Sequence, residues 1–144
     1  MKYQKVADAY IVRLEIGEEV CDCLTRLAEH EGITLAEISG IGACDYVSAG
    51  RFDPPTREYI AAESREHLEI ISLSGSLSLN NGAPYLHIHA LLADPFSGSS
   101  IAGHITKLVI SATAEIILHT MPAKIDRFVC EKTGLSILDL PNEL

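Results

Sequence analysis

Basic residues are scarce in this sequence, which has 11 lysines and arginines against 20 aspartates and glutamates and a net charge of -9. Proteins that bind nucleic acids gain much of their affinity by neutralising phosphates with lysine and arginine, and no basic run occurs here. Folding could still gather Arg51, Arg57 and Arg65 into a local patch. The charge balance therefore disfavours DNA as a partner without excluding it.

Long apolar segments are also absent. No run approaches the roughly 18 to 20 residues that span a bilayer, and the N-terminal residues Met1–Lys5 lead into no hydrophobic signal region. In a chain without an export signal, the four cysteines are more typical of free thiols than of a disulfide framework. We expect a cytoplasmic protein with no membrane partner.

What remains is the composition of an ordinary globular protein. The 144 residues are 47% hydrophobic and 22% charged, which favours a single domain over residues 1–144 with a core from about residue 9 to about residue 139. No internal repeat of roughly 20 to 50 residues is evident.

One helix is predicted, and it lies near the N-terminus. Residues Ala9–Ile16 alternate between apolar and other side chains, the pattern of a half-buried strand that ends at Gly17. From Glu18 to Glu31 the period becomes helical, and the apolar stripe consists of Val20, Cys23, Leu24, Leu27 and Ala28. Gly32 suits the left-handed turn that ends a helix.

The rest of the chain is predicted to form strands joined by short turns. Extended segments are expected at 33–50, 57–61, 71–79, 85–93, 101–110, 111–119, 128–130 and 135–138. One helix followed by consecutive strands predicts an α+β domain, with a mainly antiparallel β-sheet and one long N-terminal helix. Segment 111–119 is nearly continuous in apolar and small residues and is expected at the centre of the sheet. Many strand edges need partners, which favours an oligomer.

Three local patterns refine these strands. Gly40 and Gly42 indicate a bulge, a sharp bend or a close backbone approach. Asn81-Gly82 suits the positive φ angles of a tight hairpin. In segment 71–79, Ile71, Leu73, Leu77 and Leu79 alternate with serines, whereas the preceding Leu68 and Ile70 are apolar on the opposite phase. That change of phase indicates a bulge or a strand covered on both sides at its start.

The residues with the clearest chemical potential are three histidines. His87 and His89 lie at positions i and i+2 of an expected strand, so their side chains point to the same face. His104 lies on the strand after a single loop and is the natural third ligand of a zinc site with one open position. His119 is a weaker fourth candidate, and His30 and His67 are expected in solvent.

Pairing register decides whether the three rings converge. If paired residue numbers sum to 193, His89 faces His104 and all three rings share a face. If they sum to 194, Ala90 faces His104 and the ring of His104 points away, because a slip of one residue reverses every side chain. The sequence leaves both registers open, and it leaves open whether the rings bind metal or are buried and hydrogen-bonded.

Glu115 is the other unusual residue, a carboxylate between Ala114 and Ile116. Buried carboxylates are usually paired, hydrogen-bonded or functional. Glu115 is therefore the candidate catalytic residue, either orienting a ligand histidine or acting as a general base. An edge or interface glutamate paired with a lysine or arginine would give the same pattern.

These motifs resemble those of a known family. The segments Leu68–Ser76, Leu86–Ala90 with Asp94, Ala102–His104 and Thr113–Ile116 are similar, in this order, to the PPC domain (plants and prokaryotes conserved), also called the domain of unknown function 296. The resemblance runs from about Tyr10 to Leu138, nearly the whole chain, and its prokaryotic members stand alone.

The resemblance implies a compact α+β domain that forms a homotrimer, with a metal cluster that maps onto His87, His89 and His104. Zinc is preferred for a set made only of imidazoles. Plant members add AT-hooks that bind the minor groove, but this sequence has no Arg-Gly-Arg-Pro core. The DNA-binding expectation of the family is therefore weakened here.

Two hypotheses of function follow. The first is a trimeric domain whose three-histidine zinc site binds a small ligand or catalyses an unidentified reaction. The alternative is a non-enzymatic module that associates with DNA or serves as a protein scaffold.

Overall fold

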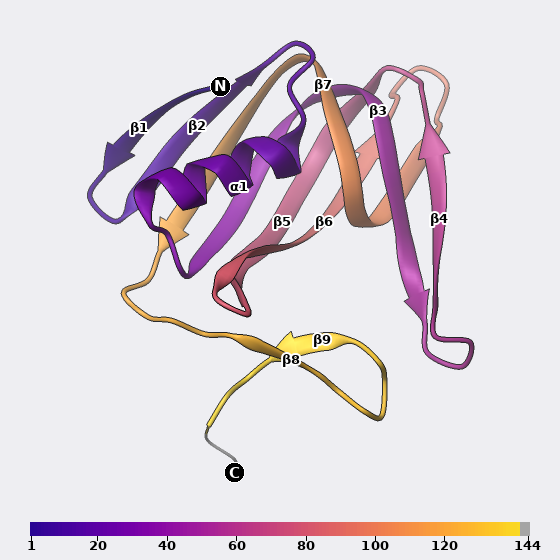
Figure 1. Cartoon of the computed structure of the whole chain (residues 1–144). Helices are drawn as coiled ribbons and strands as arrows, with labels where there is room; N and C mark the ends of the chain where they lie inside the picture. The colour runs from indigo at the N-terminus through magenta and orange to yellow at the C-terminus, as the bar shows by residue number, and fades with distance from the viewer. Residues whose placement is uncertain (142–144) are drawn as a thin grey trace.

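The computed structural model describes residues 1–141, which form nine strands and one helix (Figure 1). The N-terminal part comprises β1 (Lys2–Val6), β2 (Ala9–Glu15) and α1 (Val20–Glu31). The strands that follow are β3 (Ala36–Asp53), β4 (Glu58–Ser64), β5 (Leu68–Asn80), β6 (Ala83–Ala93), β7 (Ser100–Thr120), β8 (Arg127–Val129) and β9 (Ser136–Leu138).

Seven strands form one antiparallel sheet in the order β1-β2-β7-β6-β5-β3-β4. β3 also pairs with β7, so that β7, β6, β5 and β3 close into a ring. β8 and β9 form a separate two-stranded sheet. The α+β class and the mainly antiparallel sheet predicted from the sequence are confirmed.

β7 is the strand around which the sheet is built. The two segments expected at 101–110 and 111–119 are one strand of 21 residues, which pairs with β2, β3 and β6. The prediction that segment 111–119 is central is confirmed, because it lies between β2 and β3. The predicted break at residue 110 is wrong, because β3 continues to pair with β7 on both sides of it through local register shifts.

The helix is shorter than the expected long N-terminal helix, and a hairpin precedes it. α1 has 12 residues and begins after Glu19, whose side chain accepts a hydrogen bond from the Asp22 backbone N–H at 2.7 Å. Glu19 also accepts from the Leu108 N–H on β7 at 2.9 Å, which ties the start of the helix to the sheet. Gly32 ends the helix at φ 66, as predicted. β1 was not predicted, because all five of its residues are exposed and give no burial pattern.

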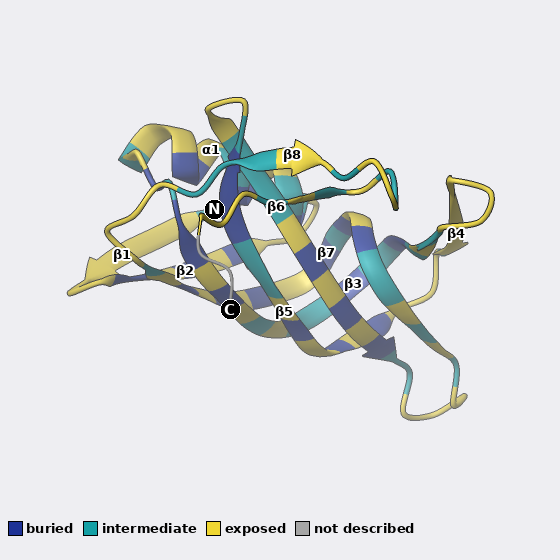
Figure 2. Cartoon of the chain, turned by 90° about the horizontal axis from the view of Figure 1, so that it is seen from below, coloured by how far each residue is buried: buried dark blue, intermediate teal, exposed yellow. Residues whose placement is uncertain are grey.

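The core lies between α1 and the face of the sheet that the helix crosses (Figure 1). All five residues of the predicted helix stripe are buried, and they pack in one cluster with the inward side chains of the ring strands, among them Leu77, Ile88, Leu108 and Leu118. Figure 2 shows the resulting alternation of buried and exposed residues along the strands. Within residues 1–141 no helix has the length and apolarity to cross a membrane.

Two predicted irregularities occur in the sheet. The β3 register shifts between Gly40 and Gly42, and a Cβ on Gly42 would lie 2.6 Å from the carbonyl oxygen of Thr113, so this is a close backbone approach. The β5 register shifts between Ile70 and Ser72. That bulge turns Ile71 outward, leaving it 52% exposed, so the prediction that Ile71 shares one face with Leu73, Leu77 and Leu79 is wrong.

Candidate metal centre

Strands β6 and β7 bring the three histidines together. His89 pairs directly with His104 across the two strands, which is the register in which paired numbers sum to 193. Residues directly opposite one another on antiparallel strands point to the same face, and His87 lies two residues before His89 on that face. Three imidazoles therefore project from one patch of the sheet.

The spacing of the rings fits one metal ion. The ring centroids of His87 and His89 are 5.1 Å apart, those of His87 and His104 are 5.2 Å apart, and those of His89 and His104 are 5.5 Å apart. One nitrogen from each ring lies within 4.8 Å of the others. Three imidazoles bound to one tetrahedral zinc through bonds of about 2.0 to 2.1 Å would have centroids about 5 Å apart. The histidine cluster is thus close to a ligating arrangement.

The backbone around His104 is fixed by contacts with β3 and β4. Gly103 has a φ of 147, and a Cβ there would lie 2.6 Å from the carbonyl oxygen of Gly50 on β3. Only glycine allows this combination of backbone conformation and close approach. The Tyr59 hydroxyl on β4 donates to the carbonyl oxygen of His104 at 2.7 Å, and the two rings are 5.7 Å apart in an edge arrangement.

The environment favours neutral imidazoles, the form that binds metal. Burial lowers the pKa of His87, and the charges of His89 and Arg127 lower it further. Burial also lowers the pKa of His104, followed by the charges of His87 and His89. His87 and His104 therefore resist protonation and keep nitrogen lone pairs available to a cation.

The histidines open into a pocket of about 630 Å³. Its walls come from the ring of strands, from β4 and from the C-terminal hairpin β8–β9. The residues that line it are Gly50, Arg51, Phe52, Tyr59, Ser76, Tyr85, His87, His89, His104, Arg127 and Leu135–Leu138. Ser76 is on the hydroxyl-bearing face of β5 and pairs with His87. The pocket has both apolar walls and a few polar groups, as small-molecule sites usually do.

The structure separates the other predicted site residues from the histidines within one chain. Glu115 is exposed on β7, opposite Arg13 of β2 and Ile41 of β3, in a groove that contains none of the three histidines. It lies near the far end of a long, bent strand, on the outer face. His119 is exposed near the end of the same strand and does not line the histidine pocket. The expectation that Glu115 stands beside the metal ligands is not met in a single chain.

Sequence reasoning missed the walls of the pocket. Tyr59, Arg127 and Leu135 reach it from segments far apart in sequence, and their positions depend on the packing of two hairpins. The hydroxyl face of β5 was the one available signal, because it indicated a polar surface next to the histidine strand.

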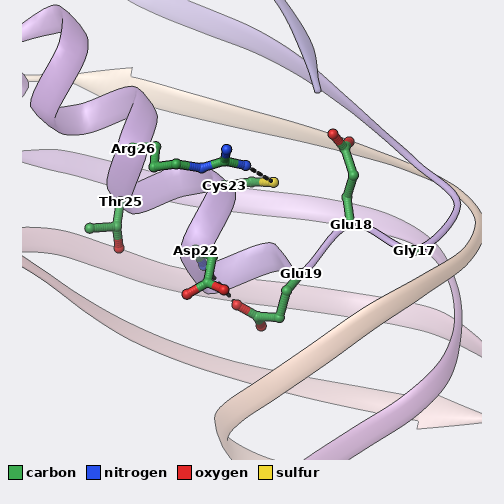
Figure 3. A pocket seen from close by; sticks show the side chains of 7 residues that line it. All are labelled: Gly17, Glu18, Glu19, Asp22, Cys23, Thr25 and Arg26. Carbon is green, nitrogen blue, oxygen red and sulfur yellow. Dashed lines mark hydrogen bonds between the residues drawn. The ribbon is translucent and has the colours of Figure 1, made fainter.

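A second hollow lies at the start of α1 and is lined by Gly17, Glu18, Glu19, Asp22, Cys23, Thr25 and Arg26 (Figure 3). Three of its polar side chains already have partners in the fold. Glu18 pairs with the N-terminal ammonium of Met1, Glu19 caps the helix, and Arg26 donates to the Cys23 sulfur at 3.2 Å. We assign no function to this hollow.

The fold and the histidine cluster define a class of small β-rich domain with a candidate metal site, and the family follows from comparison. The model of the Plants and Prokaryotes Conserved (PCC) domain, also abbreviated PPC, matches residues 1–122. The chain belongs to this family, as its motifs predicted. No curated protein matches the chain by sequence.

Solved structures agree over nearly the whole chain. A candidate DNA-binding protein from Bacteroides thetaiotaomicron is 30% identical with a TM-score of 0.91, and the alignment covers 96% of each chain. A protein from Archaeoglobus fulgidus described as metal-containing is 32% identical with a TM-score of 0.85, covering 97% of this chain and 100% of that one. A plant- and prokaryote-conserved protein from Pyrococcus horikoshii is 28% identical with a TM-score of 0.84, covering 99% of this chain and 96% of that one.

Proposed function

We propose that this protein binds one zinc ion per chain through His87, His89 and His104, and that the open coordination position faces the pocket where a small ligand binds or reacts. The observation that carries the proposal is the triangle of ring centroids, with sides of 5.1, 5.2 and 5.5 Å. An all-imidazole set suits zinc, and three protein ligands leave one position open. The Archaeoglobus relative described as metal-containing supports the same conclusion.

The chain's own residues would prepare the site for such an ion. β6 and β7 hold the three imidazoles on one face, and burial of His87 and His104, which lowers their pKa values, keeps those rings unprotonated. When bound, zinc would supply Lewis acidity toward an oxygen or nitrogen of the ligand. The surrounding walls would select the ligand by shape and charge.

Elemental analysis after purification without an affinity tag tests the metal proposal. We expect about one zinc per wild-type chain, and loss of that zinc in His87→Ala and His104→Ala. His119→Ala is the matched control, because it removes an exposed imidazole from β7 outside the pocket. The proposal would be disproved if the metal content of the wild-type protein did not exceed that of the buffer background. Circular dichroism of each variant establishes that lost metal does not reflect lost fold.

We further propose that the chain assembles into a homotrimer. Four exposed isoleucines, Ile11, Ile41, Ile71 and Ile117, line a groove on the outer face of the sheet, and Ile41 is 58% exposed. Exposed apolar groups that gather in one place usually mark an interaction surface. Glu115 lies among these apolar groups in the same groove, so it would belong to the interface between subunits. Sedimentation equilibrium tests this, with an expected mass three times the 15.6 kDa of one chain.

DNA binding is the second candidate, because relatives from Bacteroides thetaiotaomicron and Ralstonia eutropha are described as candidate DNA-binding proteins. On this chain, Arg65 and Lys107 both approach the ring of Tyr46, at 4.7 and 5.6 Å from its centroid, and form a small cationic patch. If that patch binds phosphates, replacing both residues with glutamine lowers the salt slope of duplex binding by about 2. No duplex binding at low salt would disprove this candidate.

A further inference from the structure

The histidine pocket has a charge opposite to that of the whole protein. The chain has 20 acidic residues and a net charge of -9, yet the described residues that line this pocket include two arginines, three histidines and no aspartate or glutamate. A local field of this sign attracts small anions. The two arginines differ in whether their charge is already neutralised.

Arg51 is neutralised by a neighbour. Its Nη1 atom donates to the carboxylate of Asp53 at 2.7 Å, and its side chain is 66% exposed at the rim of the pocket. Because the charges of Arg51 and Asp53 cancel, this pair adds no net charge to the pocket.

Arg127 has no carboxylate within ion-pair distance among the described residues. Three contacts nevertheless hold its guanidinium in place. Its Nε donates to the Ser78 hydroxyl at 2.8 Å, its Nη1 donates to the Ser136 carbonyl at 2.9 Å, and its guanidinium carbon lies 4.5 Å from the Tyr85 ring centroid. Its Nη2 makes no hydrogen bond to any residue that the structure describes.

The adjacent acid does not neutralise Arg127. The Asp126 carboxylate accepts hydrogen bonds from the backbone N–H groups of Asn81 at 2.9 Å and Gly82 at 3.3 Å, so it is held by the β5–β6 turn. A fixed, half-buried guanidinium with unused N–H groups is suited to a carboxylate or phosphate, because its planar fork matches their oxygens. It also costs little entropy to order when the ligand binds.

We propose that the pocket binds a small oxyanion, a carboxylate or phosphate group, between the three histidines and the guanidinium of Arg127. This inference rests on the proposed metal site and names the ligand class of that site. Arg127 lies beyond residues 1–122, where the family model matches. The C-terminal hairpin would thus add ligand selection to the histidine cluster of the domain.

A structural role for Arg127 must be separated from ligand binding, because the same contacts join β8 to β5 and β9. Arg57 supplies the control. It donates to the Glu131 carbonyl at 2.9 Å and so pins the C-terminal hairpin to the β3–β4 turn, but it does not line the pocket. Arg57→Gln removes this one contact of the hairpin and changes neither of the arginines that line the pocket.

Isothermal titration calorimetry in a zwitterionic buffer measures binding of acetate and of inorganic phosphate to zinc-loaded and metal-free protein, with acetamide as the neutral counterpart of acetate. We expect saturable binding of at least one anion and weaker binding of acetamide. Arg127→Gln should weaken anion binding about tenfold or more, since hydrogen bonds to charged groups contribute about 1.5 to 3 kcal/mol. Arg127→Lys should recover part of it, and Arg57→Gln, which changes a residue outside the pocket, should stay within about twofold of wild type.

Each other outcome overturns the inference. Acetamide binding as tightly as acetate would mean that charge is not recognised, and unchanged anion affinity in Arg127→Gln would remove Arg127 from the site. Equal losses of anion affinity in Arg57→Gln and Arg127→Gln would mean that the loss comes from displacement of the C-terminal hairpin. Zinc content measured on the same samples separates the two proposals. Absence of zinc disproves the metal site, whereas anion binding that depends on Arg127 in metal-free protein supports the oxyanion site on its own.

Discussion

His89 on β6 and His104 on β7 are direct partners in the sheet, with ring centroids 5.5 Å apart. The pairing joins a local feature, the His87-x-His89 spacing on one strand, to a residue on the next strand. Because side chains alternate in direction along a strand, a slip of one residue would turn His104 to the opposite face. The histidine cluster is therefore a property of the sheet register as much as of the histidines.

Gly103→Ala should break the register at this point. A Cβ at residue 103 would lie 2.6 Å from the Gly50 carbonyl oxygen, and the φ of 147 is strained for alanine. We expect a destabilisation of about 2 kcal/mol or more and a loss of metal affinity. Urea unfolding and metal titration measure the two effects. Gly98→Ala is the control: its φ is 78 and nothing lies within 4 Å of its Cβ position, so strain alone should cost about 1 kcal/mol, with metal binding retained.

The metal-free protein should lose stability as the pH falls through the unfolded-state pKa of histidine. Burial holds the folded-state pKa of His87 and His104 below 6.5. Below about pH 6.5 the unfolded chain therefore binds more protons than the folded one, and the free energy of unfolding decreases with falling pH until the folded-state pKa values are passed. Unfolding curves between pH 7.5 and 5 measure the slope.

The double variant His87→Gln, His104→Gln should have a smaller slope over that interval, since it lacks both depressed groups. An unchanged slope would assign the pH dependence to other residues. Zinc should enlarge the effect in the wild type, because protonated imidazoles cannot ligate and metal binding adds to folding free energy.

The parts of this fold that were predictable from sequence have local causes. The helix stripe from Val20 to Ala28, the Gly32 terminus and the Asn81-Gly82 turn, with φ angles of 52 and 79, each depend on residues close in sequence. The phase change near Ile70 likewise indicated the bulge that the structure contains.

The parts that were not predictable depend on pairing between distant segments. β1 is exposed along its length and gives no periodic signal. The continuity of β7 across residue 110 and the choice between the two histidine registers both depend on how β7 pairs with β3 and β6. Arg127 reaches the pocket because Ser78 and Ser136 hold its guanidinium, and Ser78 is 49 positions away in sequence, a relationship that strand periodicity cannot encode.

Ile88 should be the residue through which the core supports the site. It lies between His87 and His89 on β6, and its side chain is 1% exposed in the core, on the opposite face. Ile88→Ala should lower the free energy of unfolding by about 2 to 5 kcal/mol, and the conservative Ile88→Val by about 0.5 to 1.5 kcal/mol. Urea unfolding with an unchanged m value checks both. Equal effects of the two changes would mean that the residue is not packed as described.

Ile41→Lys should dissociate the proposed homotrimer while leaving each chain folded. Ile41 belongs to the apolar groove on the outer face and is 58% exposed in the single chain. It is not part of the core cluster, so a lysine there should change the free energy of unfolding of a monomer very little. In an assembly that covers the groove, the same lysine would bury a charge without a partner, which costs several kcal/mol. Sedimentation should therefore give the mass of one chain for the variant, with a far-ultraviolet circular dichroism spectrum like that of wild type.

Phe96→Lys is the matched control, since Phe96 is 97% exposed on a loop outside this groove. If Ile41→Lys sediments with the same mass as the wild type and Phe96→Lys does not, the subunits meet through the loop and not through the isoleucine groove.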